Sequence, residues 1–393
     1  MAQTINTNVA SLNAQRNLTN SQGSLATSLQ RLSSGLRINS AKDDAAGLAI
    51  SERMNSQIKG LSVATRNAND GISLAQTAEG ALVEVGNNIQ RIRELAVQAA
   101  NATNSQSDRD ALQAEVKQLV SEIDRVANNT SFNGTKLLDG SFTNQVFQIG
   151  ADSGQTIGIN NIVDSNVNSL GKAQFAAAQT STAAYAAGTA TAAGTISGMV
   201  INTVAIDTVN IAIGDDAAKV TDNVISAINN KMDQTGVYAS KDSTGKLTLT
   251  SLDAGKDFAF TDGTQADGTG ITAAGTGIAA ALASAGTTNY AKDINISSFT
   301  GAQKAIEIAE KALTSINSAR AELGAVQNRF SSTIANLQAT SENISASRGR
   351  IVDADFATET ANLTRGQILQ QAGTAMLAQA NGLPQNVLSL LRG

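Results

Sequence analysis

Two pairs of adjacent aspartates, Asp43-Asp44 and Asp215-Asp216, come closest to a chemical site in this chain. Paired carboxylates can bind a divalent cation or work as a general acid and base, but both roles need further converging groups. The chain has no histidine and no cysteine, so the commonest general base, the commonest metal ligand and every thiolate nucleophile are absent. Acidic groups favour helix N-termini. We therefore interpret Asp43-Asp44 as a helix start or an interface and Asp215-Asp216 as a solvated turn.

Other ligand classes find equally little support. The glycine-rich stretch 263–277 lacks the Lys-Ser/Thr completion and the following helix of a phosphate-binding loop. With 28 basic and 33 acidic residues and no basic run, the chain carries no electrostatic signature of nucleic-acid binding. We expect no enzyme activity, no metal and no cofactor.

The residues alone predict a cytoplasmic protein. The first residues have neither the basic nor the apolar region of a cleavable secretory signal. No stretch approaches the roughly 20 consecutive apolar residues that a membrane-spanning helix needs, so no membrane partner is expected.

The two ends of the chain have the spacing of long helices. Near the N-terminus, leucines recur with the alternating four-and-three spacing of a coiled-coil seam at Leu18, Leu25, Leu29, Leu32 and Leu36. Towards the other end, apolar residues recur every seven positions at Ala309, Ile316, Leu323, Phe330, Leu337, Ile344 and Ile351. Residues 305–351 would form a helix of about 70 Å, at roughly 1.5 Å per residue. Such a helix cannot bury its apolar stripe alone.

Two further helices are predicted between these ends. Heptad positions are apolar at Val85, Ile89, Ile92, Ala96 and Ala99, and again at Leu112, Val116, Leu119, Ile123 and Val126. The polar residues 101–107 break the pattern, and Ser107 with Asp110 resembles a capping box. A short loop between two helices predicts that they pack antiparallel.

After the second of these helices the periodicity changes to that of strands. Asn133-Gly134 and Asp139-Gly140 are turn dipeptides, and residues 146–149 and 156–159 alternate, which predicts hairpins beside the helices. From about 176 to 291 the composition shifts to Ala, Gly, Thr and Ser, around a predicted strand at 200–206, helix at 217–232 and strand at 246–250. We predict a mainly α fold with an added β or α+β insert.

The ends also carry long motifs that closely resemble bacterial flagellin, in the same order, at residues 5–8, 33–48, 67–82, 323–330 and 370–381. The resemblance covers roughly 1–175 and 295–393. It implies that residues 1–45 and 352–393 form a terminal antiparallel coiled coil in a filament core, unstructured in the free monomer. It further implies that 46–175 and 292–351 form a helical rod with β-hairpins, and that 176–291 form a variable outer surface domain.

The resemblance also implies a function in assembly. The chain is expected to polymerise with itself into the extracellular filament of the bacterial flagellum, exported unfolded by the type III apparatus, without a cleavable signal, and serving motility. The filament-core seam would comprise Leu18, Leu25, Leu29, Leu32, Leu36, Ile368, Leu369, Met376, Leu377, Leu383, Val387 and Leu390. Expected partners are the flagellar cap, the hook–filament junction proteins and a cytosolic export chaperone at the C-terminal segment.

A second expected surface also rests on the resemblance. Residues 90–98 and Glu115 resemble the stretch that Toll-like receptor 5 recognises in enterobacterial flagellins, which implies contacts from Gln90, Arg91, Glu94, Leu95, Gln98 and Glu115. From the residues alone, Arg91 and Glu94 are ordinary exposed helix charges and Leu95 is a packing residue.

Three rival functions remain to be weighed. A hook–filament junction protein has related ends but ordinarily lacks this dense set of motifs. An adhesin would use the Thr- and Ser-rich insert to contact glycans. A zinc protease in the insert would need a His-Glu-x-x-His helix, and the chain contains no histidine.

Overall fold

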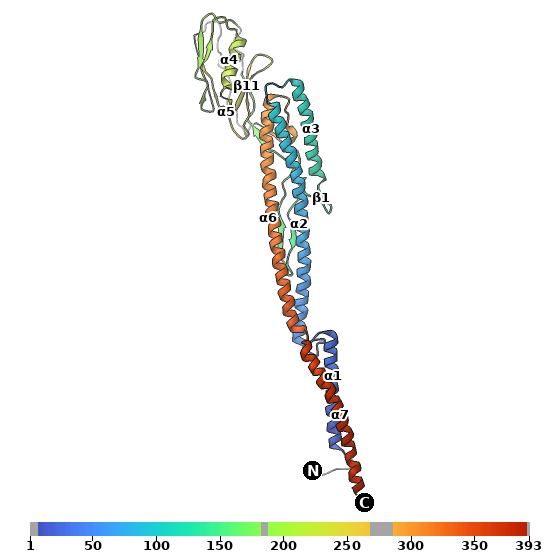
Figure 1. Ribbon diagram of the computed structural model, residues 1–393. Coiled ribbons are helices and arrows are strands. Elements are labelled where there is room, and N and C mark those ends of the chain that lie inside the picture. The colour runs from blue at the N-terminus through green and yellow to red at the C-terminus, as the bar shows by residue number, and fades with distance from the viewer. Residues whose placement is uncertain (1–6, 182–187, 268–285, 391–393) are drawn as a thin grey trace. The chain divides into compact units, whose positions relative to one another are not determined.

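The computed structural model describes residues 7–181, 188–267 and 286–390, and the side chains of 383–390 are outside that description. Long helices dominate (Figure 1). The helices are α1 (Val9–Ser34), α2 (Ala45–Ala99), α3 (Gln106–Asn129), α4 (Ala217–Asn229), α5 (Met232–Thr235), α6 (Phe299–Val352) and α7 (Phe356–Leu390), with a 3₁₀ turn at Ala291–Asp293. This arrangement confirms the predicted mainly α fold with a β-containing insert.

The strands are short and form small sheets. They are β1 (Ser131–Phe132), β2 (Thr135–Lys136), β3 (Gln145–Gln148), β4 (Thr156–Ile159), β5 (Ala173–Phe175), β6 (Gln179–Thr180), β7 (Gly194–Ser197), β8 (Val200–Ile201), β9 (Val204–Ala205), β10 (Val209–Ile211), β11 (Val237–Lys241), β12 (Leu247–Ser251), β13 (Phe260–Thr261), β14 (Thr264–Asp267) and β15 (Thr287–Asn289). The sheet orders are β1-β2, β3-β4, β15-β5, β10-β7-β14, β11-β12-β6 and β13-β8-β9.

The chain divides into two compact units. The first contains Met1–Asn69, Phe147–Ile157 and Phe330–Gly393, and the second contains Asp70–Val146 and Gly158–Arg329. Helices α2 and α6 therefore contribute residues to both units. The predicted three-part division into terminal coiled coil, rod and insert stays a prediction.

In the first unit, both long helical segments break at the same place. Helix α1 ends at Gly35, which adopts φ 71° and donates its N–H to the carbonyl of Arg31. The following residue, Leu36, forms a β-bridge with Asp353, and the Arg37 N–H donates to the carbonyl of Val352 at 2.7 Å. Leu36 thus lies outside the helix in which the leucine series places it, because the left-handed glycine reverses the chain one residue earlier.

Aspartates begin the helices that follow these breaks. The Gly47 N–H donates to Asp44 Oδ1 at 2.8 Å, and Asp43 Oδ2 accepts from the backbone N–H groups of Asn39 and Ser40. These bonds, that of Ser40 first, lower the pKa of Asp43. Asp43-Asp44 therefore organises the start of α2, as predicted.

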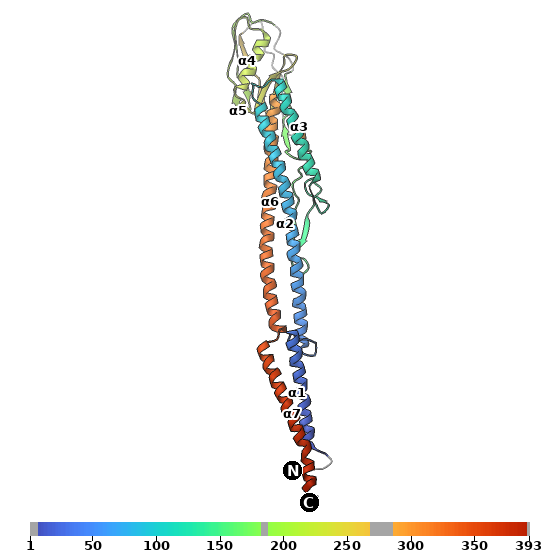
Figure 2. The same cartoon turned by 45° about the vertical axis from the view of Figure 1, so that its right-hand side comes forward.

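In the second unit, α2, α3 and α6 lie side by side (Figures 1 and 2). Ion pairs tie α2 to both neighbours, and apolar side chains fill the space between them. The predicted heptad positions of α2 are fully buried, with exposed fractions of 0% or 1% at Val85, Ile89, Ile92, Ala96 and Ala99. On α3, Val116 and Ile123 are at 0%, whereas Leu112, Leu119 and Val126 are half-buried.

The corner between α2 and α3 corrects the predicted capping box. Ser105, not Ser107, is the N-cap of α3, and its side chain accepts from the Asp108 N–H while Asp108 accepts from the Ser105 N–H. The helix starts one residue later, at Gln106, and Arg109 donates back to the carbonyl of Ala99 at 3.0 Å. Serine occurs at both 105 and 107. Ser105 becomes the N-cap because the hydrogen bond from Arg109 to Ala99 holds the start of α3 close to the end of α2.

The insert builds its own hydrophobic core from α4 and the strands around it, with Val220, Val224, Ile228, Ala239 and Leu249 at 0% exposure. Two predictions made for it are wrong. Residues 200–206 are not one strand but the hairpin β8-β9, because Asn202 and Thr203 adopt φ of 50° and 69° and turn the chain. Helix α4 ends at Asn229 instead of 232, since the Asn229 amide pairs with both backbone groups of Ala239 on β11.

The prediction for Asp215-Asp216 is half wrong. Asp216 is the N-cap of α4 and accepts from the Lys219 N–H. Asp215 is 4% exposed, accepts from the Ala212 N–H, and pairs with Lys219 Nζ at 2.6 Å. Its hydrogen bond to Lys219 lowers the pKa of Asp215, so this residue is a buried organiser of the turn and not a solvated one.

Candidate assembly and recognition surfaces

Helices α1 and α7 of the first unit pack antiparallel, as predicted, but their contact is built from small residues on α7. Leu25 lies over Gly366 and Leu18 lies over Gly373. A Cβ atom at either glycine would come within 3.2 Å of the facing leucine Cδ1. Large side chains of α1 therefore fill spaces that α7 leaves open, and the two backbones approach closely.

Hydrogen bonds and one ion pair close the ends of this helix pair. Asn8 Nδ2 donates to the carbonyl of Ala380 at 2.7 Å, and Ser11 Oγ donates to Asn381 Oδ1 at 2.7 Å. At the other end, Arg31 lies 4.0 Å from Glu359, whose side chain is 9% exposed. These contacts set the register, and Ala380 continues the seven-residue spacing of Gly366 and Gly373.

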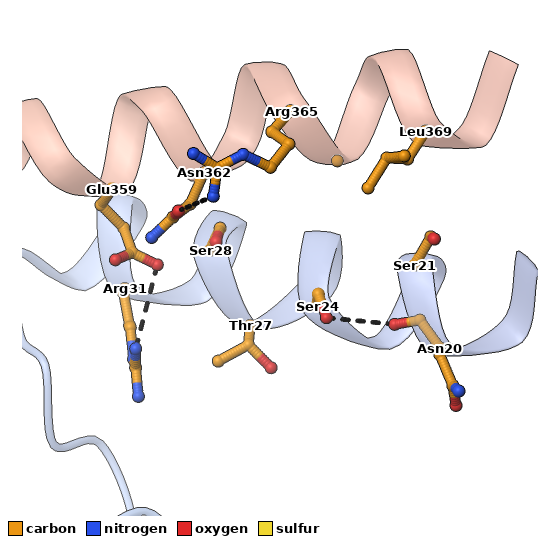
Figure 3. Close-up of a pocket in the computed structure, with 11 residues that line it drawn as sticks. Asn20, Ser21, Ser24, Thr27, Ser28, Arg31, Glu359, Asn362, Arg365 and Leu369 are labelled. Atoms are coloured by element: carbon orange, nitrogen blue, oxygen red, sulfur yellow. Dashed lines mark hydrogen bonds and ion pairs between the residues drawn. The ribbon is translucent and has the colours of Figure 1, made fainter. Parts of the chain in front are cut away.

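A polar groove runs along one side of the pair and encloses about 480 Å³ (Figure 3). Helix α1 lines it with hydroxyl groups, among them Ser24, which donates to its own helix at the carbonyl of Asn20. Helix α7 contributes Glu359, Asn362, Arg365 and Leu369. Because the α1 hydroxyl of Ser24 is satisfied within the helix, it offers an acceptor and not a donor to the groove.

The apolar seam positions expected on these helices are divided between exposed and half-buried side chains. Leu29 is 50% exposed, Ile368 60%, Leu369 49% and Met376 63%. Leu18, Leu25, Leu32 and Leu377 are half-buried. Leu383, Val387 and Leu390 lie outside the residues whose side chains are described. The expectation that all of these form a filament seam stays a prediction, since the single chain buries none of the described members completely.

The sequence reasoning missed the seven-spaced series Gly366, Gly373 and Ala380. The sequence did contain a signal, because small residues repeated every seven positions indicate a face where two helices approach closely, just as large apolar residues at that spacing indicate a packed seam. Glycine is not an apolar heptad residue and is unfavourable inside a helix, so a search for an apolar stripe passes over it.

The second candidate surface lies on α2 and α3, in the second unit. Arg91 Nε donates to Glu115 Oε1 at 2.9 Å, and its Nη1 donates to Glu94 Oε2 at 3.2 Å. The hydrogen bonds to Glu115 and then to Glu94 raise the pKa of Arg91. The Arg91 side chain is 50% exposed, so its guanidinium is held in place but remains accessible.

The six residues predicted for this surface do not all reach solvent. Gln90, Arg91, Glu94, Gln98 and Glu115 are exposed, whereas Leu95 is 1% exposed and belongs to the core of the second unit. On the other flank of α2, Arg93 pairs with Glu310 of α6 at 2.8 Å. Five residues thus form an accessible surface, and Leu95 packs beneath it.

Within residues 7–181, 188–267 and 286–390, no group of acidic side chains is placed to hold a metal ion. In the same part of the chain, no helix has both the length and the apolar character that crossing a membrane requires.

Comparison with known proteins places these surfaces in context. Residues 5–143 match the bacterial flagellin N-terminal helical region, and residues 306–391 match the bacterial flagellin C-terminal helical region. The chain is 42% identical to the B-type flagellin of Pseudomonas aeruginosa, with both chains covered to 100%. The chain belongs to the flagellin family.

A flagellin of another genus agrees with this assignment. Flagellin D of Vibrio cholerae is 44% identical over 395 residues, again with 100% of both chains covered. The solved structure of FliC from Burkholderia pseudomallei covers 66% of this chain and 99% of its own, at 27% identity and a TM-score of 0.38.

Family membership decides the class of function. Flagellins are structural proteins of a filament, so this chain is a filament subunit and not an enzyme. The resemblance and the expected absence of enzyme activity are confirmed on this ground.

Proposed function

We propose that the chain polymerises into the extracellular filament of a bacterial flagellum and thereby serves motility. One observation carries this proposal beyond family membership. Among the described residues, seven of the twelve large apolar side chains that are exposed belong to α1 and α7, namely Val9, Leu12, Leu29, Phe356, Ile368, Leu369 and Met376. Exposed apolar surface of this kind marks a site of association.

The assembly step follows from the same helices. In a single subunit the described residues of α1 and α7 pack mainly against each other, so their pairing is weak and the terminal segments 1–45 and 352–393 order fully on docking. At the end of a growing filament, neighbouring copies cover the exposed side chains. Contacts between unlike surfaces that do not close produce an open helix, so growth continues without limit.

A three-part division of labour accompanies this proposal. Segments 1–45 and 352–393 form the filament core, 46–175 and 292–351 form the rod, and 176–291 form the variable surface domain. The breaks at Gly35 and Asp353 and the separate hydrophobic core of the insert support these boundaries.

Regrowth of filaments tests the proposal. Purified filaments are dissociated by mild heating, and the monomers are added to short filament seeds and followed by electron microscopy. We expect the seeds to elongate. Monomers that never extend a seed, under conditions where the dissociated protein is folded by circular dichroism, would contradict the proposal.

Export and assembly partners are proposed from the family. The chain passes through the type III apparatus, is held beforehand by a cytosolic export chaperone at its C-terminal segment, and meets the hook–filament junction and cap proteins outside the cell. The exposed apolar residues of α7, led by Ile368 and Met376, are the surface that a chaperone must cover. Binding of purified chaperone to the chain with and without residues 352–393 tests this partner, and equal binding would exclude it.

A second proposed role is recognition by Toll-like receptor 5 through the α2–α3 surface of Gln90, Arg91, Glu94, Gln98 and Glu115. The support is the preformed Arg91 cluster, whose guanidinium is fixed by two carboxylates and yet half exposed. A fixed side chain loses little conformational entropy when it binds. Leu95 supports the surface from below.

Arginine substitution tests this role. Arg91→Ala should lower the potency of receptor activation in a cell reporter assay about thirtyfold, since truncating a central arginine contact at an interface costs about 2 kcal/mol. Arg125→Ala is the matched control, because Arg125 is an exposed α3 arginine paired with Glu122. Equal potency of the Arg91 variant and the control would exclude the role.

A further inference from the structure

The segment that leads into α6 is fastened to α3 by one buried glutamine. Gln113 of α3 is 9% exposed. Its Nε2 donates to the carbonyl of Ile294 at 3.3 Å, and its Oε1 accepts from the Ile296 N–H at 2.6 Å. The side-chain amide thus pairs with both kinds of backbone group, as a neighbouring strand would.

This pairing is needed because the segment is buried. Ile294 is 6% and Ile296 0% exposed, so their backbone groups are removed from water together with their side chains. A buried backbone N–H or carbonyl without a partner is strongly unfavourable. The glutamine amide supplies both a donor and an acceptor, and it carries no charge at any ordinary pH.

The fastening continues directly into α6. Ser298 begins that helix, accepting from the Gly301 N–H, and a Cβ at Gly301 would overlap the carbonyl oxygen of Asn295. The segment therefore has little freedom between Gln113 and the helix. The hydrogen bonds of Gln113 with Ile294 and Ile296 therefore also restrain the position of α3 relative to the start of α6.

Side-chain links then close a ring among α2, α3 and α6; besides Gln113, the exposed Gln106 Nε2 of α3 donates to the carbonyl of Ser297 at 3.0 Å. Gln113 joins α3 to the start of α6, Glu310 of α6 pairs with Arg93 of α2 at 2.8 Å, and Arg91 of α2 pairs with Glu115 of α3 at 2.9 Å. Two of the links are exposed ion pairs, which contribute little alone. The Gln113 link is the buried member and has the largest penalty for being broken.

We propose that Gln113 is a positioning residue, which holds α3 in register against α2 and so sets Glu115 opposite Arg91. It lies two residues from Glu115 and faces inward while Glu115 faces out. Where this surface binds a receptor, the inference rests on the proposed recognition role. The geometry of α3 itself does not depend on that role.

The test measures α3 directly. The chain has no cysteine, so Val97→Cys on α2 and Ser121→Cys on α3, both at exposed positions, place two spin labels without competing thiols. Double electron–electron resonance should give one narrow distribution of distances between the two labels in the parent chain, which carries only these two cysteine substitutions. Gln113→Leu should broaden or shift it, whereas Gln118→Leu, an exposed glutamine of the same helix, should not.

A pH-dependent variant separates positioning from loss of folding. In Gln113→Glu, the ionised carboxylate cannot donate to the Ile294 carbonyl, whereas the protonated form can. Burial raises the pKa of such a carboxyl group. We expect a broad distribution at pH 8 that narrows at pH 5.5. The parent chain, measured at both values, controls for Asp110, Lys117, Lys292 and Asp293, which line the adjoining hollow.

The outcomes are distinguishable. A distribution that stays narrow in Gln113→Leu, or that fails to narrow at low pH in Gln113→Glu, overturns the inference whatever the receptor does. Broadening with pH-dependent recovery supports it. Unchanged receptor potency of Arg91→Ala overturns the recognition role and leaves the spin-label result standing. If both hold, Gln113→Leu should lower receptor potency severalfold, and no further in a Glu115→Ala background.

Discussion

The terminal helix pair and the helices of the second unit share heptad spacing but differ in what that spacing buries. On α2, Ile92 is 0% exposed between its neighbours. On α1, Leu25 is half-buried over Gly366, and on α7, Ile368 is 60% exposed. A third helix and a buried return segment complete the second unit, whereas among the described residues α1 and α7 pack mainly against each other. The same seven-residue periodicity therefore corresponds to apolar side chains that are fully buried within the second unit and to apolar side chains that remain partly exposed on α1 and α7.

Removal of α7 should have the largest effect. Deletion of residues 352–393 removes α7 and the partner of α1, so we expect complete loss of filament growth. The second unit contains none of these residues, and its helices should remain folded. Seeded elongation and circular dichroism measure the two effects. Filaments of normal morphology from the truncated chain would show that the partly exposed side of α1 and α7 is not the assembly surface.

Paired isoleucine truncations give the next largest contrast. Ile92→Ala should lower the free energy of unfolding by about 3 kcal/mol, because it leaves a cavity in a closed core. Ile368→Ala should change it by less than about 0.5 kcal/mol, since its side chain is already in water. Denaturant unfolding of the monomer measures both. For Ile368→Ala we expect weaker contacts between subunits, which would raise the critical concentration for filament growth. If both variants destabilise the monomer by similar amounts, the two regions do not differ in burial as described.

The glycine seam offers a finer test. Gly366→Leu should push α1 away from α7, at a cost of about 1–3 kcal/mol for overpacking, and should speed amide hydrogen exchange throughout α1. Gly23→Ala is the matched control, since a Cβ there meets no atom within 4 Å. Replacing a mid-helix glycine by alanine should raise the free energy of local opening of the helix by up to about 1 kcal/mol and thereby slow exchange. Slower exchange in both variants would mean that the glycines are not contact positions.

The smallest expected effect concerns pH at the break between α6 and α7. Asp355 accepts from the hydroxyl and N–H of Thr358 and from the Ala357 N–H, and these bonds, the hydroxyl first, lower its pKa below the ordinary 3.8. A lowered pKa in the folded state means that the carboxylate stabilises α7 above pH 3.8, and that this contribution is lost as the pH falls through the lowered value.

Amide chemical shifts of Ala357 and Thr358 should follow this titration, with a midpoint below 3.8. Asp355→Asn should abolish it while keeping a capping side chain. A midpoint at or above 3.8 would indicate that the start of α7 is not formed in the monomer.

Much of the helical architecture could be predicted because its determinants are local or periodic. The seven-residue series through Ile316 and Phe330 required one long helix, and both residues are at 0% or 1% exposure. The Asn133-Gly134 turn of β1-β2 was equally legible, since both residues adopt the positive φ, 48° and 81°, that this dipeptide favours.

The failures have a common cause, which is that contacts made in the folded chain decide between local structures that the sequence permits equally. Ser105 and Ser107 both suit a helix N-cap, and the return of Arg109 to the end of α2 decides between them. Asn202-Thr203 lacks the glycine that signals a turn, and the Asn202 side chain is held instead by the carbonyl of Thr235 and the N–H of Ala259. Such partners are distant in sequence and could not be anticipated.

By itself the sequence determined that the chain has long amphipathic helices at both ends, a strand-forming insert and no residues for catalysis by histidine or cysteine. These properties follow from composition and spacing. Only the tertiary structure decided which stripes are covered. It seats Leu18 and Leu25 on glycines, leaves Ile368 and Met376 in water, and places Gln113 against a segment 181 residues away. Burial depends on which other segments of the chain pack against each helix, and the spacing of apolar residues does not identify those segments.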